Sequence, residues 1–116
     1  MNNSYPCIWL CDIETSIEWY ADFLGFNCSY KSAIKKPEFA VIEKENLKIF
    51  LIQSDNQDRY ASNTVVIETD EIEEAFDAAE KAGTIIIQSI ESGVFGGKEF
   101  ILKDYEDNKI IYHQSA

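Results

Sequence analysis

The side chains with chemically useful groups are few, and the only histidine, His113, lies near the C-terminus in the segment "NKIIYHQ". Its single imidazole cannot complete a zinc site with the three cysteines of the chain. Glu68, which follows the apolar run "TVVI", could act as a general base, but no second titratable group occupies a matching position. His113 is therefore interpreted either as a residue that lines a ligand site or as a hydrogen-bonded histidine at the C-terminus.

The cysteines are interpreted as reduced residues of small apolar character. Cys7 and Cys11 are four positions apart in a predicted strand, which separates them by about 13 Å, farther than a disulfide can span. Three is an odd number, and no CxxC motif is present. A reactive thiol is the less favoured alternative.

Length and composition indicate one compact domain. The chain has 116 residues, of which 46% are hydrophobic, with only five Gly and two Pro, and this composition disfavours disorder. No apolar run reaches the roughly 20 residues of a membrane helix. The N-terminal segment "MNNSYPCIWLCD" lacks the basic start of a signal peptide, so we expect a cytoplasmic protein.

The formal net charge of −11 restricts the classes of partner. An acidic surface repels phosphate backbones and anionic lipids, so neither nucleic acids nor membranes are expected to bind. Most of the carboxylates are expected to be solvated. The acidic charge would also attract a cationic ligand.

The order of predicted elements occurs twice along the chain. In residues 1–54 a strand is followed by an amphipathic helix, which Asp12 caps and Gly25 ends. In residues 63–116 the same order recurs, with Asp70 as the expected cap and Gly83 as the stop, each 58 residues after its counterpart. The predicted strands are 6–11, 26–32, 38–45 and 47–53, then 64–69, 84–90, 98–104 and 108–114. The predicted buried stripes of the helices are Ile13, Ile17, Tyr20, Ala21 and Leu24, then Ile72, Ala75, Phe76 and Ala79.

This repetition predicts an α+β fold of two βαβββ modules in a single domain, with residues 55–62 as the linker. One module leaves the concave face of its curved mixed sheet uncovered. We therefore expect the two sheets to pair around a cleft, with the helices on the outer faces.

Two motifs resemble those of the vicinal oxygen chelate superfamily, which includes glyoxalase I, extradiol dioxygenases and the fosfomycin- and bleomycin-resistance proteins. The first is "DIETSIEWYADFLGF" at 12–26, and the second is "FGGKEFILKDYEDN" at 95–108. The second departs from the Asp-Pro-Asp-Gly-Asn turn of the family, because Tyr105 replaces the proline and Asp107 the glycine. This difference predicts a less tight turn before the last strand.

The resemblance implies a cleft in which the enzymes of the family hold a divalent metal with side chains from four strands. The corresponding positions here are Tyr5, Phe50, Thr64 and Ile111. Aromatic rings, one hydroxyl and a hydrocarbon do not make a divalent metal site. A register shift of one or two residues would bring in at most Glu68 or His113, so we expect neither a metal nor another cofactor.

Alternation along the strands assigns one set of residues to the core and another to the cleft. The expected core residues are Pro6, Ile8, Leu10, Ile49, Leu51, Val65, Ile67, Ile110 and Tyr112. The expected cleft residues include Cys7, Lys48, Ile52 and Val66. Phe95, next to two glycines, is expected to lie on a loop that closes over a ligand. The predicted ligand-binding residues are Tyr5, Trp9, Phe50, Thr64, Glu68, Phe95, Ile111 and His113.

An aromatic cleft with few polar groups is typical of sites for planar organic molecules. Together with the resemblance, it favours a metal-free, homodimeric binding protein similar to the bleomycin-resistance branch, which sequesters an aromatic, cationic drug without chemistry. The main alternative is a glyoxalase- or dioxygenase-like metalloenzyme whose ligands lie in a shifted register. A metal-independent isomerase and a purely structural dimer module are the remaining hypotheses.

Overall fold

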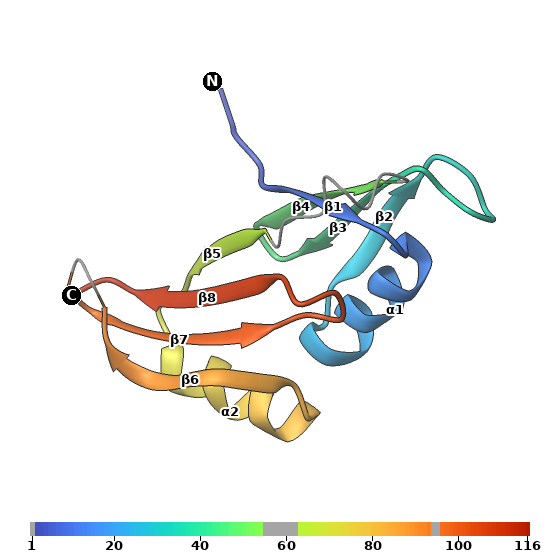
Figure 1. The fold of residues 1–116 in the computed structure, drawn as a ribbon. Helices are drawn as coiled ribbons and strands as arrows, with labels where there is room; N and C mark the ends of the chain where they lie inside the picture. The colour runs from blue at the N-terminus through green and yellow to red at the C-terminus, as the bar shows by residue number, and fades with distance from the viewer. Residues whose placement is uncertain (1, 55–62, 94–95) are drawn as a thin grey trace. The chain divides into compact units, whose positions relative to one another are not determined.

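The computed structural model describes residues 2–54, 63–93 and 96–116, and it contains the expected pair of βαβββ modules (Figure 1). The first module comprises β1 (Cys7–Leu10), α1 (Ile13–Leu24), β2 (Asn27–Lys31), β3 (Phe39–Lys44) and β4 (Leu47–Gln53). The second comprises β5 (Thr64–Glu68), α2 (Ile72–Ala82), β6 (Ile85–Ser92), β7 (Lys98–Lys103) and β8 (Lys109–Gln114). Met1–Asn63 and Thr64–Ala116 each form a compact unit. Neither helix is long and apolar enough to cross a bilayer. The predicted α+β fold class is thus confirmed, while the pairing of the modules around a cleft stays a prediction.

The first module is a four-stranded mixed sheet in the order β1-β4-β3-β2 with α1 packed on one face. The strand β1 is parallel to β4, and the other neighbours are antiparallel. Ile8 and Leu10 are fully buried, whereas Trp9 between them is half exposed, so the predicted alternation is confirmed in β1. Pro6 is exposed, contrary to expectation, because it precedes the first residue of the strand.

The helix α1 begins and ends as its sequence predicts. The Asp12 carboxylate accepts hydrogen bonds from the Thr15 backbone N–H at 3.1 Å and the Thr15 hydroxyl at 2.7 Å. Gly25 ends the helix with a φ of 75°, a left-handed conformation that costs a glycine little. The buried stripe differs from the prediction at two positions, because Ser16 is buried and Ala21, predicted to be buried, is exposed.

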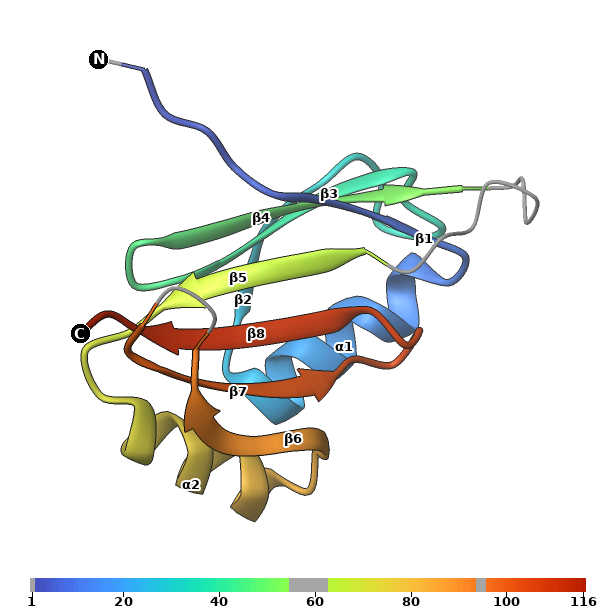
Figure 2. The ribbon, with the colours of Figure 1, turned by 60° about the vertical axis from the view of Figure 1, so that its left-hand side comes forward.

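The second module repeats this arrangement with the order β5-β8-β7-β6 and with α2 against one face of the sheet (Figure 2). Its core centres on Phe100, which stacks on Tyr112 at 4.9 Å between ring centroids and meets the edge of Phe76 at 5.2 Å. Burial raises the pKa of the Tyr112 hydroxyl to about 12. These rings fix α2 to its sheet.

The expected cap of α2 is wrong by one residue. The N-cap is Glu71 rather than Asp70, and the Glu71 side chain makes no capping hydrogen bond. The Glu71 N–H is instead satisfied by the Thr69 hydroxyl at 3.1 Å. A side-chain hydrogen bond with Glu74, together with the repulsion between the two acids, raises the pKa of Glu71. Gly83 ends the helix with a φ of 86°, as predicted.

A glutamine at the end of the last strand anchors the start of the helix in each module. The Gln53 side-chain carbonyl accepts the Ile13 N–H, and the Gln114 side-chain carbonyl accepts the Ile72 N–H, each at 2.9 Å. These two equivalent contacts satisfy backbone donors that a helix N-terminus leaves without intrahelical partners. They support the interpretation of the chain as two copies of one structural unit.

The turn before β8 is tightly hydrogen-bonded, although the family's proline and glycine are missing from it. The buried Asp104 carboxylate accepts the backbone N–H groups of Glu106 and Asn108, each at 2.9 Å, and the Asn108 side-chain amide at 3.0 Å. Asp107 adopts the left-handed conformation expected of the glycine, with a φ of 65°. The turn is thus well hydrogen-bonded, while a turn less tight than that of the family stays a prediction.

Candidate functional site

The face of the first sheet that points away from α1 carries a continuous line of aromatic rings. Tyr30 on β2 contacts Phe39 on β3 at 6.0 Å between centroids, and Phe39 meets the Phe50 ring on β4 edge-on at 5.6 Å. Phe50 stacks on Tyr5 at 5.5 Å with 12° between the ring planes. Tyr5 precedes β1, and the neighbouring Pro6 carbonyl accepts the Phe50 N–H at 3.0 Å. We call this face, with Trp9, the aromatic face.

The aromatic face is accessible, and the ammonium group of Lys48 lies beside it. Exposed fractions are 42% for Tyr5, 50% for Trp9 and 54% for Tyr30. The Lys48 ammonium lies 5.2 Å from the centre of the Tyr5 ring, within cation–π range, and 3.6 Å from the Glu43 carboxylate. Flat ring surfaces of this kind can stack on a planar organic molecule.

A hollow of about 830 Å³ adjoins the aromatic face. It is lined by residues 11–15 at the start of α1, residues 36–39 at the start of β3 and residues 52–53 at the end of β4. Phe39 and Ile52 contribute apolar surface, and Phe39 also belongs to the aromatic face. The sequence did not reveal this hollow, because three separate segments must meet to form it. The only signal was the concentration of carboxylates at 12, 14 and 38 near the ends of predicted elements.

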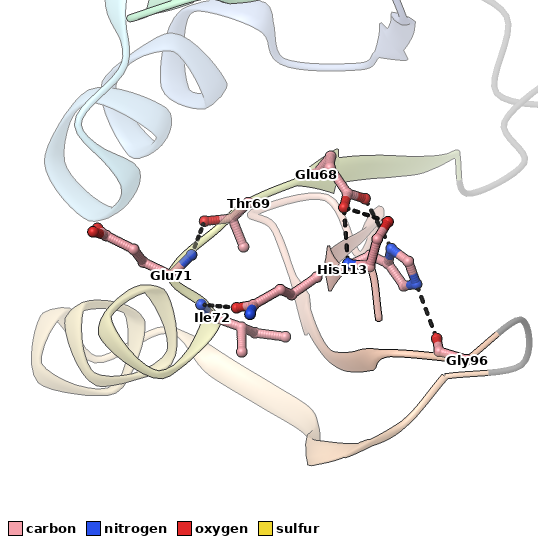
Figure 3. A network of polar contacts seen from close by, with 8 residues as sticks. Glu68, Thr69, Glu71, Ile72, Gly96 and His113 are labelled. Carbon is pink, nitrogen blue, oxygen red and sulfur yellow. Dashed lines mark hydrogen bonds and ion pairs between the residues drawn. The ribbon is translucent and has the colours of Figure 1, made fainter.

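In the second module, the corresponding face of the sheet carries charge instead of rings. Glu68 and His113 are register partners in the parallel pair of β5 and β8, with 2.8 Å between Glu68 Oε2 and His113 Nδ1 (Figure 3). The second ring nitrogen, Nε2, lies 3.3 Å from the Gly96 carbonyl oxygen. The other carboxylate oxygen, Oε1, accepts the Ser115 N–H at 2.9 Å and the Ser115 hydroxyl at 2.7 Å. Glu68 therefore has a full set of partners within its own module.

The surroundings of His113 favour its protonated form. Both ring nitrogens face groups that accept hydrogen bonds, the Glu68 carboxylate at 2.8 Å and the Gly96 carbonyl at 3.3 Å. The hydrogen bond to Glu68 raises the pKa of His113, with smaller contributions from Gly96 and from the charge of Glu99. The bonds from His113 and Ser115 lower the pKa of Glu68 to about 2. A carboxylate of so low a pKa is a weak base, which disfavours Glu68 as the general base of an isomerase.

The strand register extends this pair into a row of charges. His113 pairs with Glu99 on β7, and Glu99 pairs with Glu91 on β6. The equivalent partners in the first module are Trp9 and Ile52, which are apolar. The two modules have the same strand arrangement. The first presents an aromatic face, and the second presents an acidic row.

The positions that correspond to metal ligands do not fit a metal. In the first module the Tyr5 and Phe50 rings stack on each other. In the second, Thr64 lies opposite Lys109, and Ile111 lies between Val66 and Ile101. Within residues 2–54, 63–93 and 96–116, no three His, Cys, Asp or Glu side chains are arranged to hold a metal ion. Rings, a hydroxyl and a hydrocarbon are not the nitrogen and oxygen donors that a divalent metal requires, and the absence of a metal stays a prediction.

The predicted site residues fall into two groups. Tyr5, Trp9 and Phe50 lie together on the first module, and Glu68 and His113 make direct contact on the second. Thr64 and Ile111 lie on the second sheet but are not register partners of each other. Phe95 lies outside the described residues. Sequence reasoning missed Phe39 and Tyr30, although alternation about Val41 would have placed Phe39 on this face.

Comparison with known proteins relates the chain to one superfamily. Residues 4–112 match the family model described as Glyoxalase/Bleomycin resistance protein/Dioxygenase superfamily. A search of curated proteins by sequence gives no significant match.

Several solved structures have the same fold. A bleomycin resistance determinant encoded on the transposon Tn5 matches with a TM-score of 0.84 at 14% identity, over 99% of this chain and 98% of that one. The bleomycin-binding protein of Streptomyces verticillus, complexed with copper(II)-bleomycin, has the same TM-score and identity over 100% and 98% of the two chains. A glyoxalase-related enzyme from Clostridium phytofermentans has a TM-score of 0.81 at 11% identity, over 100% and 96%. At these identities the similarity concerns the fold alone.

Proposed function

Because the chain belongs to the glyoxalase/bleomycin resistance protein/dioxygenase superfamily, we propose that it is a metal-free binding protein whose aromatic face holds a planar organic ligand. The observation that carries this proposal is the line of contacting rings from Tyr30 to Tyr5. Two members of the line, Tyr5 and Phe50, occupy positions where metal-binding relatives would need nitrogen or oxygen donors.

The physical chemistry of the face favours ring stacking. Each aromatic pair contributes about 0.5–1.5 kcal/mol beyond the burial of apolar area, and Trp9 and Tyr5 each leave close to half of their surface accessible. The net charge of −11 favours a ligand that is also cationic. The weak basicity of Glu68 favours sequestration of the ligand over acid–base chemistry.

The similarity to bleomycin-binding structures suggests the first probe. We expect the protein to bind a bleomycin-type aromatic cation, to act in the cytoplasm and to form a homodimer. The natural ligand is of the same chemical class, a planar ring system that bears positive charge.

The two tryptophans provide a test, because Trp9 is on the aromatic face while Trp19 lies on α1 and stacks on Phe23. In the Trp19→Phe variant, titration with copper(II)-bleomycin should quench the remaining Trp9 emission. In the Trp9→Phe variant, the Trp19 emission should change much less. Isothermal titration with metal-free bleomycin supplies an independent measure of binding. Absence of both heat and Trp9 quenching at high micromolar bleomycin would refute the binding of this ligand class.

The metal content of the purified protein distinguishes the proposed binding protein from the metalloenzyme alternative. Protein purified without chelator should contain Ni, Zn, Fe and Mn far below one equivalent. A stoichiometric metal that is lost on substitution of Glu68 or His113 would contradict the proposal and favour a lyase or dioxygenase.

A further inference from the structure

The hollow beside the aromatic face has no role in the proposed function. Its volume of about 830 Å³ lies within the range of roughly 300–1,000 Å³ that is usual for small-molecule sites. The residues that line it belong to the first module. The half-buried Phe39 and Ile52 and the buried Pro37 supply apolar surface. The hollow can therefore take a small organic molecule that is partly apolar.

Most of the polar side chains that line the hollow are already bonded within the protein. The two oxygens of the Asp12 carboxylate accept the N–H and the hydroxyl of Thr15, and a Glu14 carboxylate oxygen accepts the Lys36 N–H. The Gln53 amide bonds in both directions to backbone groups at the start of α1. These contacts use several of the N–H groups at this helix end, so the helix end does not offer a site for an anion.

Two charged side chains of opposite sign remain for a ligand. The Lys36 ammonium and the Glu38 carboxylate line the hollow and are exposed, and neither group has an ion pair or a hydrogen bond with the part of the chain that the structure describes. They flank the buried Pro37, so their Cα atoms are at most about 7 Å apart. The Ser32 hydroxyl holds this segment by accepting the N–H groups of Glu38 at 3.0 Å and Phe39 at 3.1 Å. A fixed backbone thus presents one cation and one anion beside an apolar surface.

We propose that the hollow binds a short apolar peptide with free termini, its ammonium group at Glu38 and its carboxylate at Lys36. The apolar side chains of the peptide then lie against Phe39 and Ile52. The termini of a dipeptide are also at most about 7 Å apart, which matches the spacing of the two charged residues. A simple cation would leave the Lys36 ammonium without a counter-charge, whereas a zwitterion pairs with both free groups. This class of ligand differs from the planar cation proposed for the aromatic face, so one binding activity can fail without the other.

Titration with leucyl-leucine and its blocked derivatives tests the proposal. Isothermal titration should give a Kd on the order of 0.1–1 mM for leucyl-leucine, from the ligand efficiency that is usual for small molecules. N-acetyl-leucyl-leucine and leucyl-leucine amide should each bind roughly two- to fivefold more weakly, which is the effect of losing one exposed ion pair. Glycyl-glycine, which lacks the apolar side chains, should give no heat. Absence of heat with millimolar leucyl-leucine, or an amide that binds as tightly as the free dipeptide, would overturn the proposal.

Variants without the charges identify the two contacts. In Glu38→Gln acetylation of the peptide should no longer weaken binding, and in Lys36→Gln amidation should no longer weaken it, because the partner of the blocked terminus is gone. Lys35→Gln is the matched control, since Lys35 is exposed but does not line the hollow, and it should leave all three affinities unchanged. The free energy of unfolding should stay the same in each variant, because the substituted side chains are exposed. If both blocking groups weaken binding to the variants as much as to the wild type, the proposal is wrong.

Tyr5→Ala distinguishes the hollow from the aromatic face. Tyr5 stacks on Phe50 and does not line the hollow, so the affinity for leucyl-leucine should not change while that for bleomycin falls. An equal loss of affinity for both ligands would place the dipeptide on the aromatic face. That result would overturn this inference and leave the proposed function intact.

Discussion

Glu68 and His113 are 45 residues apart in sequence, yet they lie directly opposite each other in the parallel pair of β5 and β8, joined at 2.8 Å. The apolar pair Trp9 and Ile52 occupies the equivalent place in the first module. One backbone arrangement therefore supports an ion pair in one module and an apolar surface in the other. The behaviour of the ion pair leads to the first two predictions.

The titration of His113 can be followed directly, because the chain has no other histidine. We expect NMR of the imidazole to give a pKa above the ordinary value of 6.5, since the hydrogen bond to Glu68 stabilises the charged ring. In Glu68→Gln the pKa should fall back towards 6.5. A pKa that is unchanged by this substitution would mean that the pair is not formed in solution.

The two residues of the ion pair should make the free energy of unfolding depend on pH in opposite directions. The pKa of Glu68 is lowered to about 2, so its contribution is present above about 4.5 and is lost as the pH falls from there towards 2. The pKa of His113 is raised, so its contribution is complete below 6.5 and is lost as the pH rises through the folded-state value. Urea unfolding should therefore show the largest difference between wild type and His113→Gln between pH 4.5 and 6.5. An equal difference at pH 9 would contradict this assignment.

Removal of the Phe50 ring should weaken the binding of the bleomycin probe. Phe50 contacts both Tyr5 and Phe39, so Phe50→Ala interrupts the line of rings. The loss of one stacking partner corresponds to about 0.5–1.5 kcal/mol, or roughly a 2- to 10-fold rise in Kd. Phe23→Ala on α1 is the matched control, since this ring stacks on Trp19 instead. Equal effects of the two variants in isothermal titration would mean that the ligand does not bind at the aromatic face.

The two helices should respond differently to loss of their N-cap residues. Asp12→Ala removes both hydrogen bonds to Thr15 and should lower the free energy of unfolding by about 1 kcal/mol, within a range of roughly 0.5–2 kcal/mol. Glu71 makes no capping bond, and its interaction with Glu74 raises its pKa, so Glu71→Ala should be neutral or slightly stabilising. Chemical denaturation of both variants distinguishes the caps, and a similar loss in each would contradict the structure.

In the turn before β8, substitution of an exposed residue should affect the free energy of unfolding much less than substitution of a buried one. Asn108→Ala leaves the buried Asp104 carboxylate without the amide donor at 3.0 Å, and a buried polar group that loses its partner costs about 1–3 kcal/mol. Asp107→Asn is the control, because asparagine tolerates the left-handed conformation and the substitution weakens an exposed contact with Lys103 at 3.4 Å. Its effect on the free energy of unfolding should stay below about 1 kcal/mol. Thermal or urea unfolding of both variants checks this contrast.

The fold and most side-chain orientations were determined by the sequence, because they follow from local periodicity. The alternation of Ile8, Trp9 and Leu10 predicts which side chains point to the helix, since successive residues of a strand point to opposite faces. Asp12, Gly25 and Gly83 mark helix ends for reasons that lie within a few residues of each. The prediction of Asp70 as the N-cap was wrong because two acidic residues, Asp70 and Glu71, precede Ile72. Only the backbone conformation decides which of the two occupies the capping position.

The tertiary structure alone decided which distant groups meet. The contact of Glu68 with His113 depends on the register of a parallel pair whose strands are joined through a helix and two further strands. The hollow requires residues 11–15, 36–39 and 52–53 to converge. Local propensity carries no information about such encounters, because the packing of whole elements sets the distances between them.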